Sequence, residues 1–435
     1  MADAITHKRI LTIAAPLVLS NISVPLVGLV DTGVVGQLPD SASMIGAVGL
    51  GGVIISLLYW TFGFLRMGTV GLTSQAVGAL DWDEVNALFF RAVGLGFALG
   101  TLFILLQTPI FWAAFQLSPA SDAVENLTRT YLQIRIFSAP AAVALMGVLG
   151  WLVAQERSTS VLILFTWING LNILLDVVFV LGFDMGVAGV AWATFLAEWT
   201  GLIFGTWMCR SAFRGMPGWH RVLDVGGLWQ MAIVNRDILI RTLLLLVAFT
   251  SFSFLGANLG DVTLAANTVL QQFVMITAFG MDGFALAAET LVGSAYGAKT
   301  VPRVRRAAIM TSYWGAGIAV AMSVVFLFFG PVIIDILTKD EAVRDMARLY
   351  MWWMVLTPIL GWPSWMLDGI FIGATRSKDM RNMMVISFAL YVLFLLVFLP
   401  LWGNDGLWLS ITLFYVVRGI TLGIRYPALE RSAAL

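Results

Sequence analysis

The sequence is dominated by apolar segments that are long enough to cross a lipid bilayer. A transmembrane helix needs about 20 predominantly apolar residues. Segments of that length recur along the chain and are separated by short breaks rich in charged residues, Gly, Pro, Asn or Asp. They occupy residues 10–37, 43–79, 86–107, 128–154, 160–182, 187–209, 228–257, 262–296, 303–334, 345–374, 381–402 and 406–427. The sequence therefore predicts an all-α polytopic membrane protein with about twelve transmembrane helices.

The composition is typical of a membrane protein. Hydrophobic residues make up 60% of the sequence, charged residues make up 11%, and the mean hydropathy is +0.91. A soluble domain is only about half apolar and about one quarter charged. The balanced net charge gives no reason to expect a nucleic-acid partner, and the lone Cys209 excludes an internal disulfide. The first apolar run continues past Asp31 without a cleavage-site pattern, so we interpret it as a retained first span.

Lysine and arginine favour one side of the predicted membrane. If both termini are cytoplasmic, only five bases lie in or beside the outer connections, namely Arg129, Arg135, Lys339, Arg344 and Arg348. The inner side collects Lys8, Arg9, Arg91, Arg157, Arg210, Arg214, Arg221, Lys299, Arg303, Arg305, Arg306, Arg376, Lys378, Arg381, Arg425 and Arg431. Because cytoplasmic loops are enriched in Lys and Arg, this asymmetry predicts cytoplasmic amino and carboxyl termini.

Two halves of the chain repeat each other with a constant displacement, which carries position 75 onto position 294. The motif at 75–79 returns at 294–298, and the helix end at 150–158 returns at 369–377. A Gly-x-x-Gly pair at 186–189 returns at 403–406, with a slightly shorter displacement. We therefore predict an amino-terminal lobe at 1–213, a cytoplasmic linker at 214–227 and a carboxyl-terminal lobe at 228–435, each lobe with six helices. Secondary transporters built from repeats bind their cargo near the interface between the repeats.

An acid inside the first apolar segment is the leading functional candidate. An ionised Asp at the bilayer centre costs about 2.5–3.5 kcal/mol even on mild insertion scales, so Asp31 is either functional or close enough to the helix end to meet water. Pro16 and Pro25 precede it in the same helix, where each removes a backbone hydrogen bond. These prolines predict two places at which the helix can bend.

The fifth apolar segment supplies a second acid with polar neighbours. Asn172 and Asp176 are spaced i, i+4 and share a helix face with Asn169, and Thr194 of the sixth segment offers a further oxygen. These groups either join helices to one another or form a site. Two carboxylates in one dry pocket cannot both stay charged cheaply, so Asp31 and Asp176 can hold a proton or share a Na⁺.

The duplication makes these acids informative. The repeat displacement carries Asp31 onto Thr250 and Asp176 onto Leu395, so neither acid belongs to the scaffold that the two halves share. We expect a cation site that is special to the amino-terminal half.

A second charge cluster is predicted mainly in the carboxyl-terminal half. Its members are Arg66, Arg236, Asp237, Arg241, Asp282, Glu289 and Asp368. The i, i+4 spacing of Asp237 and Arg241 predicts an ion pair between them. The cluster is either functional or a structural charge network.

Methionine and aromatic residues are dense in the helices predicted to border a central cleft. Examples are Met275, Phe279, Met281, Phe284, Trp352, Trp353, Met354 and Trp362. Soft, repackable side chains suit flat apolar molecules, although many of these residues will serve ordinary packing.

Together these residues resemble those of a transporter family. Asp31 behind a proline, Asn172-x-x-x-Asp176, Thr194 after the Gly-x-x-Gly entry and the duplicated halves are similar to the MATE (multidrug and toxic compound extrusion) transporters. Residues 63–75, Asn235-Arg-Asp237 and Asp282-Gly-Phe-Ala285 resemble its DinF branch. The resemblance implies two lobes around a V-shaped central cleft. It also implies a cation site at Asp31, Asn172, Asp176 and Thr194, with Pro16 as the bending proline.

The resemblance implies a secondary antiporter of the bacterial inner membrane. It would export small organic compounds, often cationic or amphipathic, in exchange for H⁺ or alternatively Na⁺. We expect a monomer in the lipid bilayer, with no cofactor, no metal other than Na⁺ at the four-residue site and no nucleic acid. The alternative is a flippase for lipid-linked precursors, which would carry a strongly cationic cavity. An intramembrane enzyme is disfavoured because the only histidines, His7 and His220, lie at loop positions.

Overall fold

A computed structural model describes residues 4–39, 41–117 and 121–434, and within these ranges all regular structure is helical. Eleven helices in this part of the chain are long and apolar enough to cross a membrane. The last of them, α17 (Ser377–Ser432), contains Gly403 at φ 54° and ψ −124°, where the helix is interrupted, so it comprises two spans. Helices satisfy every backbone hydrogen bond within one segment, as lipid requires. The prediction of an all-α protein with about twelve spans is confirmed.

The helices form two compact units, which we describe separately. The amino unit comprises Leu19–Val77 and Asp81–Met231, and the carboxyl unit comprises the residues up to Val18, Gly78–Leu80 and Ala232 onward. Three helices, α1 (His7–Val35), α3 (Gly63–Gly78) and α12 (Val225–Ala257), therefore contribute residues to both units. The lobe boundaries expected from the sequence stay a prediction.

The amino unit contains most of the shorter helices. In chain order these are α2 (Ser41–Thr61), α3 (Gly63–Gly78), α4 (Trp82–Leu105), α5 (Gln107–Leu117), α6 (Asp122–Arg135), the 3₁₀ turn η1 (Ile136–Ser138), α7 (Ala139–Ala154), α8 (Ser158–Asp176), the π-helical turn η2 (Val177–Gly182), α9 (Gly186–Met208), α10 (Arg210–Arg214) and α11 (Trp219–Val222). The first turn of α4 is fixed by Asp81, whose side chain accepts a 3.0 Å hydrogen bond from the backbone N–H of Glu84.

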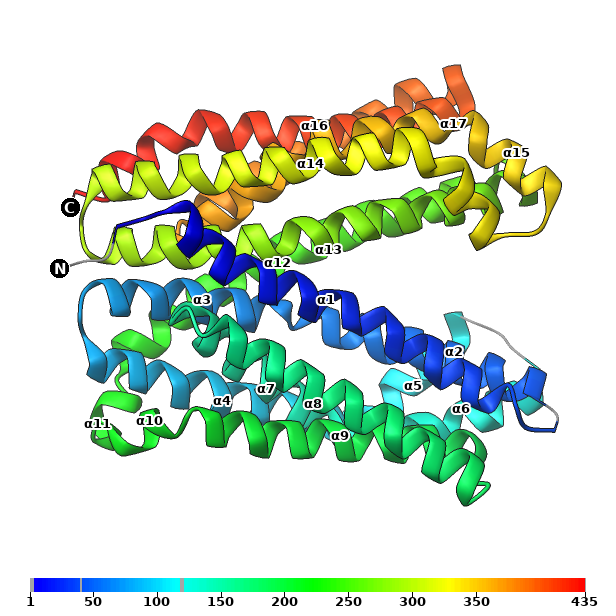
Figure 1. The fold of residues 1–435 in the computed structure, drawn as a ribbon, viewed down its shortest axis with the longest axis horizontal. Helices are drawn as coiled ribbons and strands as arrows, with labels where there is room; N and C mark the ends of the chain where they lie inside the picture. The colour runs from blue at the N-terminus through cyan, green and yellow to red at the C-terminus, as the bar shows by residue number, and fades with distance from the viewer. Residues whose placement is uncertain (1–3, 40, 118–120, 435) are drawn as a thin grey trace. The chain divides into compact units, whose positions relative to one another are not determined.

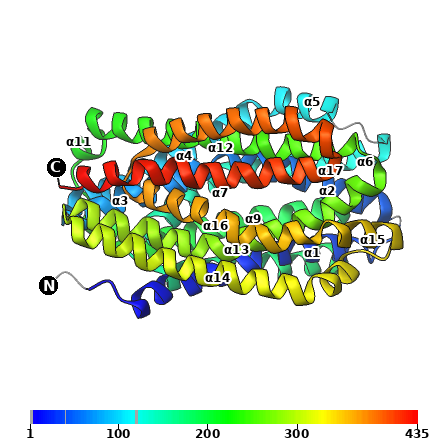
Figure 2. The same cartoon turned by 90° about the horizontal axis from the view of Figure 1, so that it is seen from above.

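The carboxyl unit consists mainly of long helices. Besides α17 they are α13 (Asp261–Gly297), α14 (Val301–Leu337), the short α15 (Glu341–Leu349) and α16 (Met351–Gly373). The four long helices α13, α14, α16 and α17 lie side by side in both ribbon views (Figures 1 and 2). Buried aromatic side chains, including Phe273, Phe326, Tyr391 and Phe414, fill the core between them. Of the second charge cluster, Asp282 and Glu289 lie on α13 and Asp368 lies on α16.

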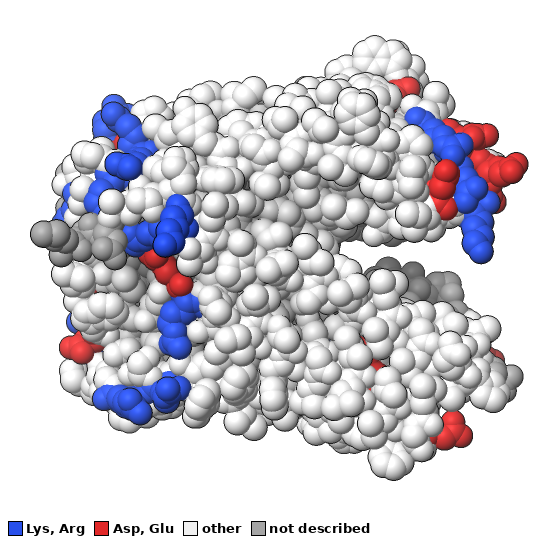
Figure 3. All heavy atoms as spheres, in the orientation of Figure 1, with Lys and Arg blue, Asp and Glu red and all other residues white. Residues whose placement is uncertain are grey.

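Charge is distributed unevenly along the carboxyl unit. Lys and Arg side chains gather over the end of this unit at which both chain termini lie, whereas acidic and basic side chains mix at the opposite end, around α15 (Figure 3). There Arg348 pairs with Asp335 at 2.6 Å. The predicted membrane orientation stays a prediction.

Backbone conformation repeats with the displacement read from the sequence. In the described chain, five non-glycine residues have positive φ, and the repeat displacement relates four of them in two pairs: Leu80 with Lys299, and Glu156 with Thr375. The fifth is Asp184, and two residues later Gly186 at φ 53° is related by the shorter displacement of the Gly-x-x-Gly pair to Gly403 at φ 54°. Non-glycine residues seldom adopt this conformation. The recurrence therefore supports two halves with one common backbone plan.

Helix packing repeats in the same way. A Cβ atom added at Gly150 would lie 2.7 Å from the carbonyl oxygen of Arg66, and one added at Gly369 would lie 2.5 Å from that of Ala285. The repeat displacement relates the two glycines to each other, and it relates Arg66 to Ala285 as well. Small residues let membrane helices approach closely, so these two glycines set equivalent contacts, α7 against α3 and α16 against α13.

The segment predicted as a linker is held to the amino unit by Arg91 of α4. This buried guanidinium donates hydrogen bonds to the carbonyl oxygens of Val222 (2.8 Å) and Arg221 (2.6 Å) and forms a 2.5 Å ion pair with Glu84. Nearby, the Asn86 amide donates to the carbonyl oxygen of Gly215 at 2.8 Å. Residues 215–222 therefore pack on α4 instead of extending freely.

Candidate functional site

Asp31 of α1 and Asp176 of α8 bring their carboxyl groups together inside the amino unit. The two groups are close enough to share a hydrogen bond when one of them carries a proton. Asp176 is completely buried and Asp31 is half-buried. Apart from Asp31, no described group donates a hydrogen bond to either carboxylate oxygen of Asp176, and Oδ1 of Asp31 also lacks a donor. A buried carboxylate without donors is costly, and a proton or a metal cation at this pair would lower that cost.

Asn172 and Thr194 form the neighbouring polar contact. The Asn172 amide donates a 3.0 Å hydrogen bond to the Thr194 hydroxyl, which in turn donates to the carbonyl oxygen of Val190 in α9. Because Asn172 lies one turn before Asp176 on α8, both side chains share a face, as predicted. Asn172 is 1% exposed, and its carbonyl oxygen accepts no hydrogen bond from the described residues. It is a third side chain with a buried, unsatisfied acceptor.

Asn169 has a structural role. Its amide donates a 2.7 Å hydrogen bond to the Ser23 hydroxyl, which joins α8 to α1 on the amino-terminal side of Asp31. Ser23 itself donates to the carbonyl oxygen of Ser20 at 2.6 Å. The polar face of α8 therefore has two parts. Asn169 joins α8 to α1, whereas Asn172 and Asp176 present unsatisfied oxygens.

Immediately after Asp176 the helix changes type. Residues Val177–Gly182 form a π-helical turn, η2, before the chain reverses at Asp184, which has positive φ. Single π-helical turns inside α-helices occur often at functional sites. Nothing in the Val-Val-Phe-Val-Leu-Gly sequence distinguishes this turn from ordinary α-helix. Sequence reasoning therefore could not have found it.

An ion pair that sequence reasoning missed lies close to the two acids. Arg135, at the end of α6, is 5% exposed and forms two hydrogen bonds, of 2.8 and 3.1 Å, with the carboxylate of Glu198 in α9. It also donates to the Ser138 hydroxyl at 2.7 Å, and its charge acts on both Asp31 and Asp176. The sequence pattern assigns Arg135 only to the outer connections. Its position inside an apolar segment, like that of Glu198, was a usable signal.

The prolines of α1 lie within one continuous helix, His7–Val35. Proline has no backbone N–H, so neither Pro16 nor Pro25 can donate the helical hydrogen bond to the residue four positions earlier. The bending role of both prolines stays a prediction.

The amino-unit arrangement suits a small cation. Four buried acceptor oxygens, from Asp31, Asn172 and both positions of Asp176, have no donor among the described residues apart from the contact between the two acids. The only nearby cation in the described chain that acts on the acids, Arg135, is already paired with Glu198. A proton shared by the carboxyl groups, or a Na⁺ ion bound by these oxygens, would supply the missing charge.

The acid of the tenth predicted span, Asp368 of α16, has the opposite surroundings. Its Oδ2 accepts hydrogen bonds from Arg241 of α12 and from Arg418 of α17. The three side chains are 4%, 6% and 2% exposed, respectively. Two arginines and one aspartate leave one excess positive charge in this buried triad. Arg418 was not among the predicted charge residues, although it too lies inside an apolar segment.

The expected ion pair between Asp237 and Arg241 is wrong. Asp237 instead pairs with Arg236 at 3.0 Å and with Arg381 of α17 at 2.7 Å, and it accepts a hydrogen bond from Ser377. Arg241 turns to Asp368. Asp237 and Arg241 each pair with a residue on a neighbouring helix and not with each other. Tertiary packing therefore overrides the local i, i+4 preference.

The remaining predicted charges have defined positions. Glu289 on α13 is 3% exposed, and Asp282, two turns earlier, is half-buried. Arg66 is half-buried on α3, and its backbone packs against Gly150. A functional role for these three residues stays a prediction.

Comparison with known proteins identifies relatives over nearly the whole chain. The family model MatE matches residues 16–178 and 238–398. The chain is 40% identical to DNA damage-inducible protein F of Escherichia coli over 423 residues, which are 96% of this chain and 91% of that protein. It is also 25% identical to the chloroplastic Protein DETOXIFICATION 44 of Arabidopsis thaliana over 94% of this chain and 80% of the relative.

Solved structures have the same fold. A MATE crystal structure in the bent conformation superposes with a TM-score of 0.87 at 20% identity, covering 98% of this chain and 97% of the other. A Vibrio cholerae MATE transporter, VcmN, in the bent form gives a TM-score of 0.84 at 19% identity, with 98% and 97% coverage. At these identities the match shows the fold alone.

Proposed function

The chain belongs to the MatE family of membrane transporters, in the branch of DNA damage-inducible protein F, and on that premise we propose that it is an antiporter that exports organic compounds in exchange for protons. It is a multi-pass membrane transporter of small organic molecules and not an enzyme. The proton would be carried by Asp31 together with Asp176, and Asn172 and Thr194 would complete the site. Na⁺ is the alternative coupling ion.

One observation carries this proposal. Four buried acceptor oxygens of Asp31, Asn172 and Asp176 have no donor among the described residues other than the two acids themselves, whose carboxyl groups are in mutual contact. A permanent structural role would favour a fixed partner, such as the arginines that hold Asp368. A carboxylate pair without one can gain and lose a cation, as a coupling site must.

The proposed cycle uses the chemistry of these residues. With a proton on the pair, the site loses a charge and the cost of burying it falls. Release of the proton restores two adjacent negative charges, which favours a rearrangement that brings water or another cation to them. Asp31 lies on α1, which also carries Pro16 and Pro25, so the charge would change on a helix with two places at which it can bend.

Location and assembly follow the same proposal. We infer a bacterial plasma membrane, both termini in the cytoplasm and a functional monomer. The bias of Lys and Arg along the sequence supports the orientation. The arrangement of the two units around a central cleft stays a prediction.

Reconstituted protein tests the coupling ion. Proteoliposomes would be given either a pH gradient at equal Na⁺ or a Na⁺ gradient at equal pH, and the uptake of ethidium and of fluorescein would be measured. We expect the pH gradient alone to drive uptake of at least one dye. Uptake that follows only the Na⁺ gradient would overturn proton coupling, and uptake that ignores both gradients would overturn antiport.

A further inference from the structure

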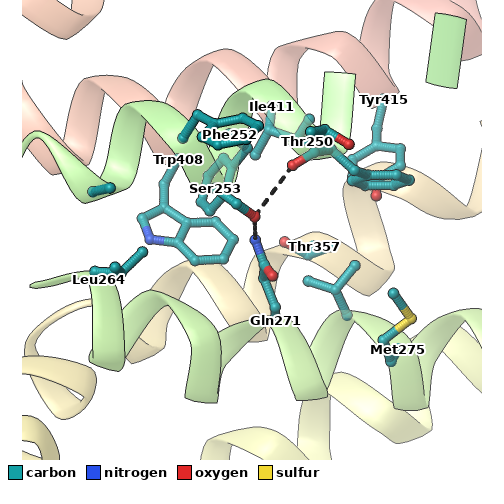
Figure 4. A pocket seen from close by; sticks show the side chains of 14 residues that line it. Thr250, Phe252, Ser253, Leu264, Gln271, Met275, Thr357, Trp408, Ile411 and Tyr415 are labelled. Atoms are coloured by element: carbon teal, nitrogen blue, oxygen red, sulfur yellow. Dashed lines mark hydrogen bonds between the residues drawn. The ribbon is translucent and has the colours of Figure 1, made fainter. Parts of the chain in front are cut away.

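The carboxyl unit contains a cavity of its own, distinct from the acid pair. It measures about 490 Å³, within the range of roughly 300–1,000 Å³ that is typical of small-molecule sites. Residues from α12, α13, α16 and α17 line it, so it lies entirely within this unit. Figure 4 shows Trp408 and Phe252 on one side, Tyr415 on the other, and Met275 near the cavity edge.

The internal repeat relates part of this cavity to the positions of Asp31, Thr194 and Glu198 in the amino unit, although Leu395, the counterpart of Asp176, does not line it. The repeat displacement relates Asp31 to Thr250, and the slightly shorter displacement that applies after the second Gly-x-x-Gly entry relates Thr194 to Ile411 and Glu198 to Tyr415. Thr250, Ile411 and Tyr415 all line the cavity. Equivalent positions of one duplicated scaffold therefore hold charges in one unit and apolar or hydroxyl-bearing side chains in the other.

The polar groups of the cavity are few and neutral. The Gln271 amide donates a 3.2 Å hydrogen bond to the Ser253 hydroxyl, and Figure 4 shows this pair between Trp408 and Tyr415. None of the described residues that line the cavity is Asp, Glu, Lys, Arg or His. A wall of this kind cannot hold a bare inorganic ion, but it suits a flat aromatic molecule that stacks on rings and accepts or donates one or two hydrogen bonds.

A buried positive charge, Arg418, acts on the Tyr415 ring of this wall. The Arg418 guanidinium carbon lies 5.9 Å from the centre of the Tyr415 ring and 5.4 Å from that of Phe414. The charged side chains that act on Arg418 are Asp368 and Arg241, which leave one excess positive charge in the triad. Interior charges are poorly screened, so their field reaches a molecule that stacks on Tyr415.

We propose that this cavity is a substrate site of the carboxyl unit and that it selects flat aromatic molecules carrying an acidic group, with that group at the Tyr415 end. To call the bound molecule a substrate rests on the proposed transport function. Binding itself needs no ion gradient and can be measured separately. A cationic aromatic molecule of the same shape would meet the same rings and an unfavourable field.

Two xanthene dyes of similar shape and opposite charge provide the test. Fluorescein, in its anionic form, and rhodamine 123, a cation, would be titrated with purified protein in detergent, and binding would be followed by fluorescence anisotropy. We expect fluorescein to bind about ten-fold more tightly, which is a plausible effect for one nearby buried charge. Equal affinities, or tighter binding of rhodamine 123, would overturn the charge preference.

Variants locate the site and its charge. Thr250→Trp would fill the cavity and weaken fluorescein binding at least about ten-fold, whereas Thr166→Trp makes the same change at an exposed position of α8 in the other unit. Arg418→Gln removes the excess charge and leaves Asp368 paired with Arg241, and Arg418→Lys keeps the charge. We expect Arg418→Gln to reduce the preference for fluorescein to within about three-fold and Arg418→Lys to retain it.

Each variant also has an outcome that contradicts the proposal. Unchanged fluorescein binding in Thr250→Trp would place the dye elsewhere. Thermal unfolding would show whether Arg418→Gln is folded. If the folded variant still prefers fluorescein to the same degree, the charge of Arg418 does not cause the preference. If added phospholipid displaces fluorescein from the wild-type protein, the cavity is an acyl-chain site and the proposal fails. Since these are equilibrium measurements, they stand whatever ion drives transport.

Discussion

Asp31 and Asp368 are both acids in membrane-spanning helices, but their surroundings are opposite. Asp31 meets a second carboxyl group, Asp176, and the nearest arginine is already paired with Glu198. Asp368 pairs with two arginines, Arg241 and Arg418. Asp368 is also the only acid among the described residues whose charge acts on Arg418. The acid pair of the amino unit therefore lacks an unpaired positive charge, while the triad around Asp368 has one in excess. From this difference we infer cation binding in the amino unit and propose that Asp368 is a structural anchor.

Removal of the anchor should have the largest effect on stability. Asp368→Ala would leave Arg241 and Arg418 buried without their acceptor, and loss of one partner from a buried ion pair typically costs about 3–5 kcal/mol. The free energy of unfolding in mixed detergent and SDS micelles measures the loss. Asp345→Ala, an exposed residue in a 3.4 Å surface pair, should change it by less than about 0.5 kcal/mol. A loss below about 1 kcal/mol for Asp368→Ala would mean that water already satisfies the arginines.

Substitution of the shared glycines tests what the two units have in common. Gly150→Ala and Gly369→Ala would each force a Cβ atom against a backbone carbonyl oxygen, and such overpacking costs about 1–3 kcal/mol. We expect similar losses from both in the same unfolding assay. Gly317→Ala, where an added Cβ meets nothing within 4 Å, should instead be neutral or stabilising. A large difference between Gly150→Ala and Gly369→Ala would break the structural equivalence of the halves.

Substitution in the acid pair should not lower the free energy of unfolding, in contrast to substitution of Asp368. Asp176→Asn removes a buried carboxylate that no described donor satisfies apart from its contact with Asp31, so we expect stability to stay constant or rise by about 1 kcal/mol while ion-coupled transport is lost. The unfolding assay and gradient-driven dye uptake would be measured on the same preparation. A destabilisation comparable to that of Asp368→Ala would show that Asp176 is an anchor as well.

Cys209 provides the smallest perturbation and reports on the amino unit alone. Burial raises the pKa of its thiol to about 12, although nearby Arg157 acts in the opposite direction. Because the thiolate is the reactive form, alkylation by N-ethylmaleimide at neutral pH should be at least about 100-fold slower than in denatured protein. The rate should rise with pH as the thiolate forms.

The same label sharpens the comparison between the units. If the two units unfold independently, Asp368→Ala should leave the alkylation rate of Cys209 close to the wild-type value. Fast labelling of Cys209 in that variant would show that loss of the anchor also opens the amino unit. Fast labelling of the native wild-type protein would contradict the buried position of the thiol.

Periodicity and charge explain which parts of the site could be predicted. The length of the apolar segments indicates the spans, and the internal repeat locates equivalent turns such as those at Leu80 and Lys299. The i, i+4 rule places Asn172 beside Asp176 on one helix face. These features depend on local geometry, which the sequence encodes directly.

Other features depend on which helices meet, which local spacing does not encode. The pairing of Arg135 with Glu198 joins α6 to α9, and that of Arg418 with Asp368 joins α17 to α16. Local spacing predicts Asp237 as the partner of Arg241, whereas the actual partner, Asp368, lies on another helix. The π-helical turn after Asp176 has no composition signal at all.

Transport driven by a pH gradient in Asp31→Asn tests the central claim most directly. The variant would be reconstituted beside wild type and Asp345→Asn, which makes the same chemical change at an exposed position. If the amino-unit acid pair carries the coupling ion, Asp31→Asn should fold normally and lose gradient-driven dye uptake, while Asp345→Asn keeps the wild-type rate. Wild-type uptake in folded Asp31→Asn would contradict the assignment of cation binding to this pair.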